Sequence, residues 1–289
     1  WQGLLETQAI EIIDINDLFT FFRQPQHYFL KQQLGIRLTD TSSDAEEREP
    51  FSLDRLEAYN INQQWIEHQL TATPFSLKKL QAQGQWVSGT VGRIEYNQQQ
   101  KLVTKFTDLI YQQNLGARKQ DQPIDITVAN YRLVGNLGNL YEKGGLLYRY
   151  ANLKGTDFIQ AWLHHLIINQ TQPQSTHLLS MDESLIFSID NNQPSHLESL
   201  INLYIQGQQQ PDVFFTEAGF AYIKQACNKR AKVPAIIKAQ DQLNKEISFD
   251  RSLQLLYQNI TDLNQLLDDS FERQCNELLL PVWNAIKHH

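Results

Sequence analysis

The stretch Ile124–Ile168 reads IDITVANYRLVGNLGNLYEKGGLLYRYANLKGTDFIQAWLHHLII, and its patterns predict the centre of the fold. Apolar residues alternate with polar ones on both sides of a turn at Glu142–Gly145, which is typical of antiparallel strands. After Gly155 the apolar residues recur at helical spacing, and we expect Thr156 to be the N-cap. The stretch therefore predicts strand, hairpin, strand and helix as the central unit of an α/β fold.

Length and composition are those of an ordinary globular protein. The 289 residues are 41% hydrophobic and 20% charged, and a chain of this length can bury a sizeable core. Neither an internal repeat nor a clean linker interrupts the sequence, so we expect one domain over residues 1–289. The chain begins with Trp1 instead of Met, and we expect it to be a fragment of a longer chain.

Neither a membrane segment nor a disulfide framework is predicted. No apolar run approaches the roughly 20 residues that span a bilayer, and no signal peptide opens the sequence. Cys227 and Cys275 are too few for a secreted scaffold and lack CxxC spacing, so we expect free, buried thiols. These features predict a soluble, cytoplasmic protein.

The net charge of -7 argues against general nucleic-acid binding, because nucleic-acid-binding proteins usually present a basic face. A local basic strip is still compatible with this charge, and the strongest basic segment is 224–238. Its candidates for DNA contact are Lys224, Lys229, Arg230 and Lys232. The same residues also suit a solvated helix end and loop, so both interpretations stay open.

Segments on either side of the central unit carry further patterns. We expect a helix that Asp17 caps and Pro25 ends, followed by a second helix that Gly35 closes. The other predicted elements are a surface or disordered loop at 39–50, helices between 53 and 84, a hairpin within 176–189, a helix at 197–207, a short strand at 213–215, a helix at 217–227 and a mostly helical tail from 248.

The sequence contains no motif for metal, nucleotide or nucleophilic chemistry. No HExxH pattern includes His164 and His165, and histidines that face solvent or pack at a core edge explain them better than a zinc site. The glycine-rich run 135–145 has no GK[ST] ending, so tight turns within a sheet explain it better than a P-loop. Because no GxSxG elbow occurs either, we expect no cofactor, no metal and no hydrolase nucleophile.

Several segments together resemble a known family of DNA-processing proteins. Residues 17–36, DLFTFFRQPQHYFLKQQLGI, resemble a segment of RecB- and AddB-type nuclease domains, in which a cysteine often precedes the proline; here that place holds Gln24. With NINQQ at 60–64, GLL at 145–147 and AWLHHL at 161–166, the chain is more narrowly similar to the C-terminal domain of the RecC family, the exodeoxyribonuclease V gamma chains. The resemblance spans nearly the whole chain.

The resemblance implies an α/β, restriction-endonuclease-like core of the PD-(D/E)xK type, with a mixed sheet flanked by helices and a degenerate active site. Such nucleases use a Gly-x-x-x-His helix, an acid, an Asp-x-Lys strand and a Gln-x-x-x-Tyr helix. Projected onto this chain, these positions hold Tyr59 and Gln63, then Gly138, then Tyr148 and Tyr150, and only Gln160 matches. Because Mg²⁺ needs hard oxygen ligands and tyrosine is neutral at pH 7, we expect no catalysis. We expect Tyr148, Tyr150 and Trp162 to fill the space where metal and phosphate would bind.

The function that the resemblance implies is non-catalytic. We expect contacts with RecB and RecD subunits, and guidance or separation of strands at double-stranded DNA ends during repair and recombination. In the family, these subunits form a helicase-nuclease complex. One alternative is an active metal-dependent nuclease with relocated carboxylates, for example Asp125 or Glu142 combined with Asp157. The other is a protein-protein interaction module without a DNA role.

Overall fold

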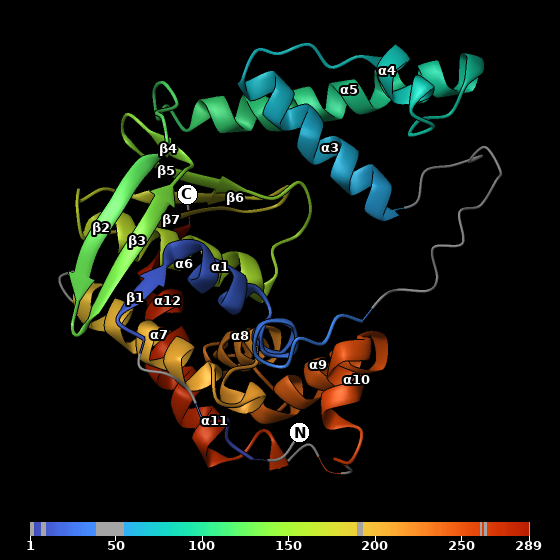
Figure 1. Cartoon of the computed structure of the whole chain (residues 1–289). Coiled ribbons are helices and arrows are strands. Elements are labelled where there is room, and N and C mark those ends of the chain that lie inside the picture. The colour runs from blue at the N-terminus through green and yellow to red at the C-terminus, as the bar shows by residue number, and fades with distance from the viewer. Residues whose placement is uncertain are drawn as a thin grey trace.

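The computed structural model describes residues 3–6, 10–38, 55–189, 193–260, 262 and 265–288. The loop predicted at 39–50 lies outside these residues. Helices and two β-sheets make up the fold (Figure 1), which confirms the predicted mixed α/β class. Within the described part, no helix combines the length and the apolar character that crossing a membrane requires.

The strands of the predicted central unit divide between two mixed sheets. In the three-stranded sheet, β3 (Tyr131–Leu137) pairs antiparallel with β2 (Gln122–Val128) and parallel with β1 (Ile12–Asp14). The five-stranded sheet has the order β4-β5-β6-β7-β8, with a parallel pair between β5 and β6 and antiparallel pairs elsewhere. Its strands are β4 (Leu140–Tyr141), β5 (Gly144–Tyr148), β6 (Thr176–Leu179), β7 (Ser184–Phe187) and β8 (Ile286–His288).

The chain leaves the first sheet and enters the second around Asn139, whose φ of 57° lies in the left-handed region that asparagine tolerates. The expectation of one central sheet is therefore wrong, because period-two spacing does not reveal which sheet a strand joins. The predicted β4–β5 hairpin is confirmed. Its glycines also allow close packing, since a Cβ atom at Gly145 would lie 2.7 Å from Cε1 of His164.

The larger hydrophobic core surrounds α6 (Gly155–Asn169), the helix of the predicted central unit. Its residues Ile159, Trp162 and Leu166 are at most 1% exposed. The helical segments of this part of the fold are α1 (Ile15–Arg23), α2 (Pro25–Tyr28), the π-helical turn η1 (Phe29–Gln33), α7 (Gln193–Gly207), the 3-10 turn η2 (Pro211–Val213), α8 (Thr216–Ala226), α9 (Ala235–Phe249), α10 (Arg251–Tyr257), α11 (Asp269–Gln274), the π-helical turn η4 (Cys275–Leu279) and α12 (Leu280–Ala285).

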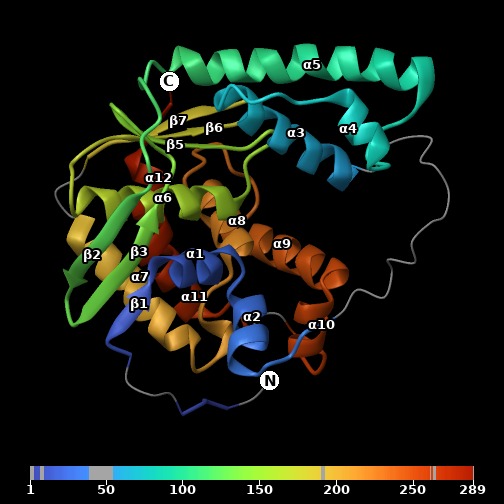
Figure 2. The ribbon, with the colours of Figure 1, turned by 45° about the horizontal axis from the view of Figure 1, so that its top comes forward.

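A second, smaller core lies on the other face of the five-stranded sheet. It is covered by α3 (Arg55–Leu70), α4 (Leu77–Ala82) and α5 (Gly89–Gln112), and Figure 2 shows these helices and α6 on opposite sides of the sheet. The sequence patterns predict α3 and α4 but not α5. The buried residues Tyr96, Val103 and Phe106 of α5 lie at helical spacing, but exposed apolar side chains elsewhere on the helix hide its amphipathic period.

Both predicted N-caps differ from those in the structure. Asp14 instead of Asp17 caps α1, and its carboxylate accepts a hydrogen bond of 2.8 Å from the backbone N–H of Asn16. The residue at the N-cap of α6 is Lys154, so Thr156 lies inside the helix. The apolar periodicity marks the body of a helix correctly, but here it places the first turn two or three residues too late.

Other local expectations have mixed outcomes. The hairpin within 176–189 and the helices at 197–207 and 217–227 are confirmed by β6, β7, α7 and α8. The short strand at 213–215 is wrong, because η2 occupies its start. The tail is mostly helical as expected, but it ends in β8. His164 and His165 are 2% and 0% exposed and do not face solvent, and the free Cys227 is exposed whereas Cys275 is buried.

Candidate functional site

Tyr148 and Tyr150, at the expected Asp and Lys positions, pack into the second core. Tyr150 is 8% exposed, and its hydroxyl accepts a hydrogen bond of 3.3 Å from Gln99 of α5. The half-buried Tyr148 donates one of 3.1 Å to Glu67 of α3. Phe106 meets both rings edge-on, at centroid distances of 6.2 and 5.2 Å. Burial raises the pKa of both phenols, so both are neutral at pH 7.

The residues of α3 at the expected Gly-x-x-x-His positions also contact other side chains. Gln63 donates its side-chain amide to the Tyr59 hydroxyl at 2.8 Å. The guanidinium of Arg149, just after β5, lies 5.1 Å from the centre of the Tyr59 ring, at the distance of a cation–π contact. These positions therefore supply neither an imidazole nor a carboxylate, and their side chains hold α3 against the end of β5.

Gly138 contacts α6, on the side of the larger core. Its carbonyl oxygen accepts a hydrogen bond of 2.8 Å from Nε2 of His164, whose buried Nδ1 has no hydrogen-bond partner in the described part of the chain. A Cβ atom at Gly138 would lie 3.0 Å from Oδ1 of Asp121. The sequence patterns missed this acid. Asp121 and Gly138 directly adjoin the paired residues Gln122 and Leu137 at the end of the β2–β3 ladder. The register of this ladder is therefore what places the acid beside the glycine.

The positions expected to form one filled site belong to different cores. Tyr148 and Tyr150 contact the helices of the second core, whereas Trp162 packs in the larger core. Its ring centroid lies 5.6 Å from His165 and 5.8 Å from Phe187. The expectation that Trp162 fills the same space as the two tyrosines is wrong, because the five-stranded sheet separates the two cores.

The carboxylates proposed for a relocated active site have separate surroundings. Asp125 forms an ion pair of 2.7 Å with Arg132 on the three-stranded sheet. Asp157 accepts a hydrogen bond of 2.7 Å from the backbone N–H of Lys154, and Glu142 lies in the β4–β5 turn. Among the described residues, no three His, Cys, Asp or Glu side chains are grouped so that they could hold a metal ion.

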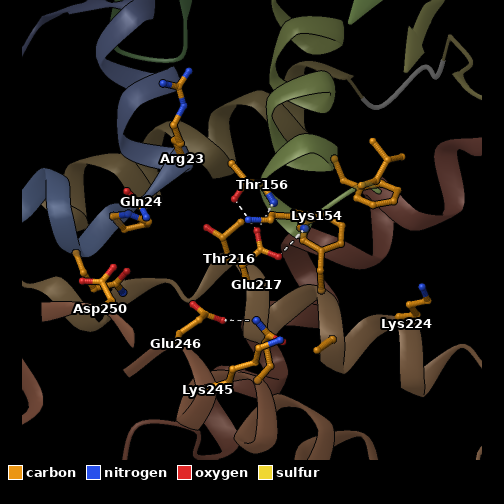
Figure 3. A pocket seen from close by; sticks show the side chains of 18 of the residues that line it. Arg23, Gln24, Lys154, Thr156, Thr216, Glu217, Lys224, Lys245, Glu246 and Asp250 are labelled. Atoms are coloured by element: carbon orange, nitrogen blue, oxygen red, sulfur yellow. Dashed lines mark hydrogen bonds between the residues drawn. The ribbon is translucent and has the colours of Figure 1, made fainter. Parts of the chain in front are cut away.

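A cleft of about 1110 Å³ lies where α1, α2, the start of α6, α8 and α9 meet (Figure 3). Glu217 of α8 reaches the N-terminus of α6 in this cleft. Its carboxylate accepts hydrogen bonds of 2.8 Å from the N–H groups of Gly155 and Thr156, and one of 2.6 Å from the Thr156 hydroxyl. The first N–H groups of a helix lack intrahelical partners, so this carboxylate caps α6 from another helix.

Comparison with known proteins identifies the family of the chain. A family model described as the RecC C-terminal domain matches residues 10–227. The chain belongs to the RecC C-terminal domain family. One curated relative, RecBCD enzyme subunit RecC of Buchnera aphidicola subsp. Acyrthosiphon pisum (strain APS), is 22% identical over 236 residues, which cover 79% of the chain and 22% of the relative. The subunit of the same name from Escherichia coli (strain K12) is 25% identical over 222 residues, or 74% and 19%. The chain spans about a fifth of the length of these relatives.

The RecC match runs from just before β1 to the end of α8, and it includes Glu217 and the positions where the resemblance predicted nuclease residues. The predicted DNA contacts of this RecC-type domain lie at the end of the matched residues and just beyond them. Lys224 is exposed on α8 and lines the cleft, and Lys229, Arg230 and Lys232 are exposed between α8 and α9. Their contact with DNA stays a prediction.

Removal of the Glu217 carboxylate is expected to destabilise this RecC-type domain. In Glu217→Ala, the N–H groups of Gly155 and Thr156 lose their acceptor, and we expect the free energy of unfolding to fall by about 2 kcal/mol. Chemical denaturation measures this change. Glu198→Ala, at an exposed position of α7, is the matched control and should change stability by less than about 0.5 kcal/mol. Equal stability of the two variants would contradict the capping role.

Proposed function

We propose that the chain is a non-catalytic, nuclease-like part of a RecBCD-type DNA-repair complex, with a single restriction-endonuclease-like domain over residues 1–289. The observation that carries the proposal is that Tyr148 and Tyr150 pack in the second core, at positions where such a nuclease would need Asp and Lys. Their hydroxyls already have hydrogen-bond partners in Glu67 and Gln99. Family membership supports the assignment to a complex, because the matched relatives are named as subunit RecC of the RecBCD enzyme.

The chemistry of phosphodiester cleavage supports the loss of catalysis. Mg²⁺ activates a phosphate when oxygen ligands, mainly carboxylates, hold it beside the scissile bond. At the projected positions, Gln63 offers a neutral amide, Gly138 offers no side chain and Tyr148 offers a neutral phenol whose proton is donated to Glu67. None of these groups supplies the negative charge that a bound divalent cation requires.

Within such a complex we assign the domain to contacts with RecB- and RecD-type subunits and to guidance or separation of strands at double-stranded DNA ends in the cytoplasm. The net charge of -7 favours contacts with protein over autonomous DNA binding. The exposed side chains of Lys224, Lys229, Arg230 and Lys232 would then meet a strand that the partners deliver. An interaction module without a DNA role would instead capture partner subunits and show no salt-dependent retention of DNA.

Incubation of the domain with linear DNA and Mg²⁺ or Mn²⁺ tests the loss of catalysis. We expect cleavage no greater than in a metal-free control, because the projected positions offer no carboxylate. Asp121→Ala and Glu142→Ala are the informative variants, since these acids lie beside Gly138 and in the β4–β5 turn. Reproducible cleavage that either substitution abolishes would overturn the proposal and assign the domain to the active nucleases.

A further inference from the structure

The cleft above Glu217 combines apolar and charged side chains from distant parts of the chain. Its apolar lining comes from α6, β7, α8 and α12 and includes Phe158, Leu185, Phe220 and Trp283. Its cations are Arg23, Lys154, Lys224 and Lys245, seen in Figure 3 around the Glu217 carboxylate. Its volume of about 1110 Å³ lies near the upper end of the roughly 300–1,000 Å³ of small-molecule sites and is large enough to hold several side chains of a polypeptide segment.

The charged side chains of the cleft differ in whether they already have hydrogen-bond or ion-pair partners. Glu217 already accepts three hydrogen bonds from α6. Asp250 accepts one of 2.7 Å from His27 and also caps α10 through the N–H groups of Ser252 and Leu253. The four cations are all exposed, and within the described part of the chain none forms an ion pair with a carboxylate. Of the other two lining carboxylates, Glu246 accepts a hydrogen bond of 2.9 Å from the neutral Gln242. The cleft therefore offers an incoming group four cations that lack an ion-pair partner among the described residues, next to the carboxylates of Glu183 and Glu246.

Phe249, at the end of α9, joins the cleft to a neighbouring hollow of about 500 Å³. It is 84% exposed, although phenylalanine is among the residues most often buried in proteins. The hollow adds the cations Lys31, Arg37 and Arg251. An aromatic side chain exposed between two cation-lined depressions is a suitable anchor for a partner that covers it.

We propose that the cleft binds an acidic segment of a partner polypeptide that carries an apolar anchor. Apolar side chains of the segment pack against the exposed Phe249 and the half-buried Trp283, and its carboxylates pair with Arg23 and Lys245. The inference rests on the proposed role in subunit contact and adds the surface and the kind of partner segment.

Two features favour a polypeptide over a DNA strand. Phe158 and Phe220 stack on each other, with 5.3 Å between ring centroids and 26° between planes, so these faces are not free for bases. The lining also contains carboxylates that repel the phosphates of every nucleotide, namely those of Glu183, Glu217, Glu246 and Asp250. A polypeptide carries carboxylates on only a few residues, so it can place them beside the cations of the cleft and away from its carboxylates.

Photo-crosslinking in the assembled complex tests the occupant. We replace Phe249 by p-benzoylphenylalanine in the full-length subunit, assemble it with its RecB- and RecD-type partners on a blunt DNA duplex, and irradiate. We expect an adduct with a partner polypeptide, which mass spectrometry maps to a segment with Asp or Glu beside apolar residues. The paired substitution Arg23→Glu and Lys245→Glu should lower the adduct yield about 10-fold. The matched control, Lys101→Glu with Lys105→Glu on the exposed surface of α5, should leave the yield unchanged.

The possible outcomes separate this inference from the proposed function. An adduct with DNA, no adduct, or a yield that survives the reversal of Arg23 and Lys245 overturns the inference. The proposed function is judged by complex assembly and by the cleavage assay. A complex that assembles normally around a non-cleaving domain, with nothing crosslinked at Phe249, would refute the occupied cleft and leave the proposed function standing.

Discussion

The double substitution Tyr148→Asp and Tyr150→Lys, which rebuilds an Asp-x-Lys strand, is expected to lower the free energy of unfolding by at least about 4 kcal/mol and to produce no metal-dependent cleavage. Loss of one buried aromatic side chain alone costs about 3–5 kcal/mol. The introduced ammonium would also lie beside Phe106 and the neutral Gln99, and a buried cation without a counter-charge is strongly unfavourable. Since a domain is stable by only roughly 5–15 kcal/mol, the second core would lose much of its packing.

Denaturant titration of the double variant, followed by near-UV circular dichroism, measures this effect. Tyr111→Asp is the matched control, because Tyr111 is 59% exposed on α5 and its replacement should change stability by less than about 1 kcal/mol. A double variant as stable as the unmodified domain, or one that cleaves DNA with Mg²⁺, would show that these positions keep the geometry of an active centre.

Lowering the pH from 7 to 5 is expected to remove about 4 kcal/mol of stability through His164 and His165 together. Burial lowers the pKa of each imidazole from 6.5 to about 4. Between these values the unfolded chain binds protons that the folded chain does not. The contribution is therefore present above about pH 6.5 and is lost as the pH falls toward 4. At pH 5, about 1.5 units below the unfolded pKa, each histidine accounts for about 2 kcal/mol.

Glu246 opposes the histidines over the same range. Burial raises the pKa of its carboxyl from 4.5 to about 7, so its contribution to stability is present below pH 4.5 and is lost as the pH rises through 7. We therefore measure the histidine effect in a Glu246→Gln background, by denaturation at pH 7 and pH 5. NMR titration of the imidazoles in the folded state provides the direct check. An imidazole of His164 or His165 that titrates near pH 6.5 there would contradict the prediction.

Local periodicity predicted those elements whose apolar residues repeat within a few positions. The strands β2, β3 and β7 are of this kind, because buried residues are interspersed with more exposed ones along each of them. β6 was predicted from its apolar run and α6 from the helical spacing of its apolar residues, although all of β6 and residues 161–168 of α6 are buried. Two elements, α5 and β8, were not predicted because no clear local pattern marks them. Exposed apolar residues mask the buried face of α5, and β8 exists because Ile286 and its neighbours pair with β7 from the far end of the chain.

For the candidate site, too, some features could be predicted from the sequence and others only from the structure. Resemblance to a family selected Gln63, Gly138, Tyr148 and Tyr150, since it depends on the order of residues along the chain. It could not show that Gly138 and the tyrosines contact different cores, nor that Asp121 stands beside Gly138. The cap of α6 was also beyond it, because Glu217 lies 61 residues after Thr156.

By itself, the sequence determined the RecC C-terminal domain family, the mixed α/β class and the replacement of the expected acids, because these depend on residue identity and short-range spacing. Only the tertiary structure decided which core each strand serves, how Glu217 caps α6 and where the cleft beside Phe249 forms. These features arise from packing between segments far apart in the chain, and no local pattern of apolar and polar residues encodes which distant segments will meet.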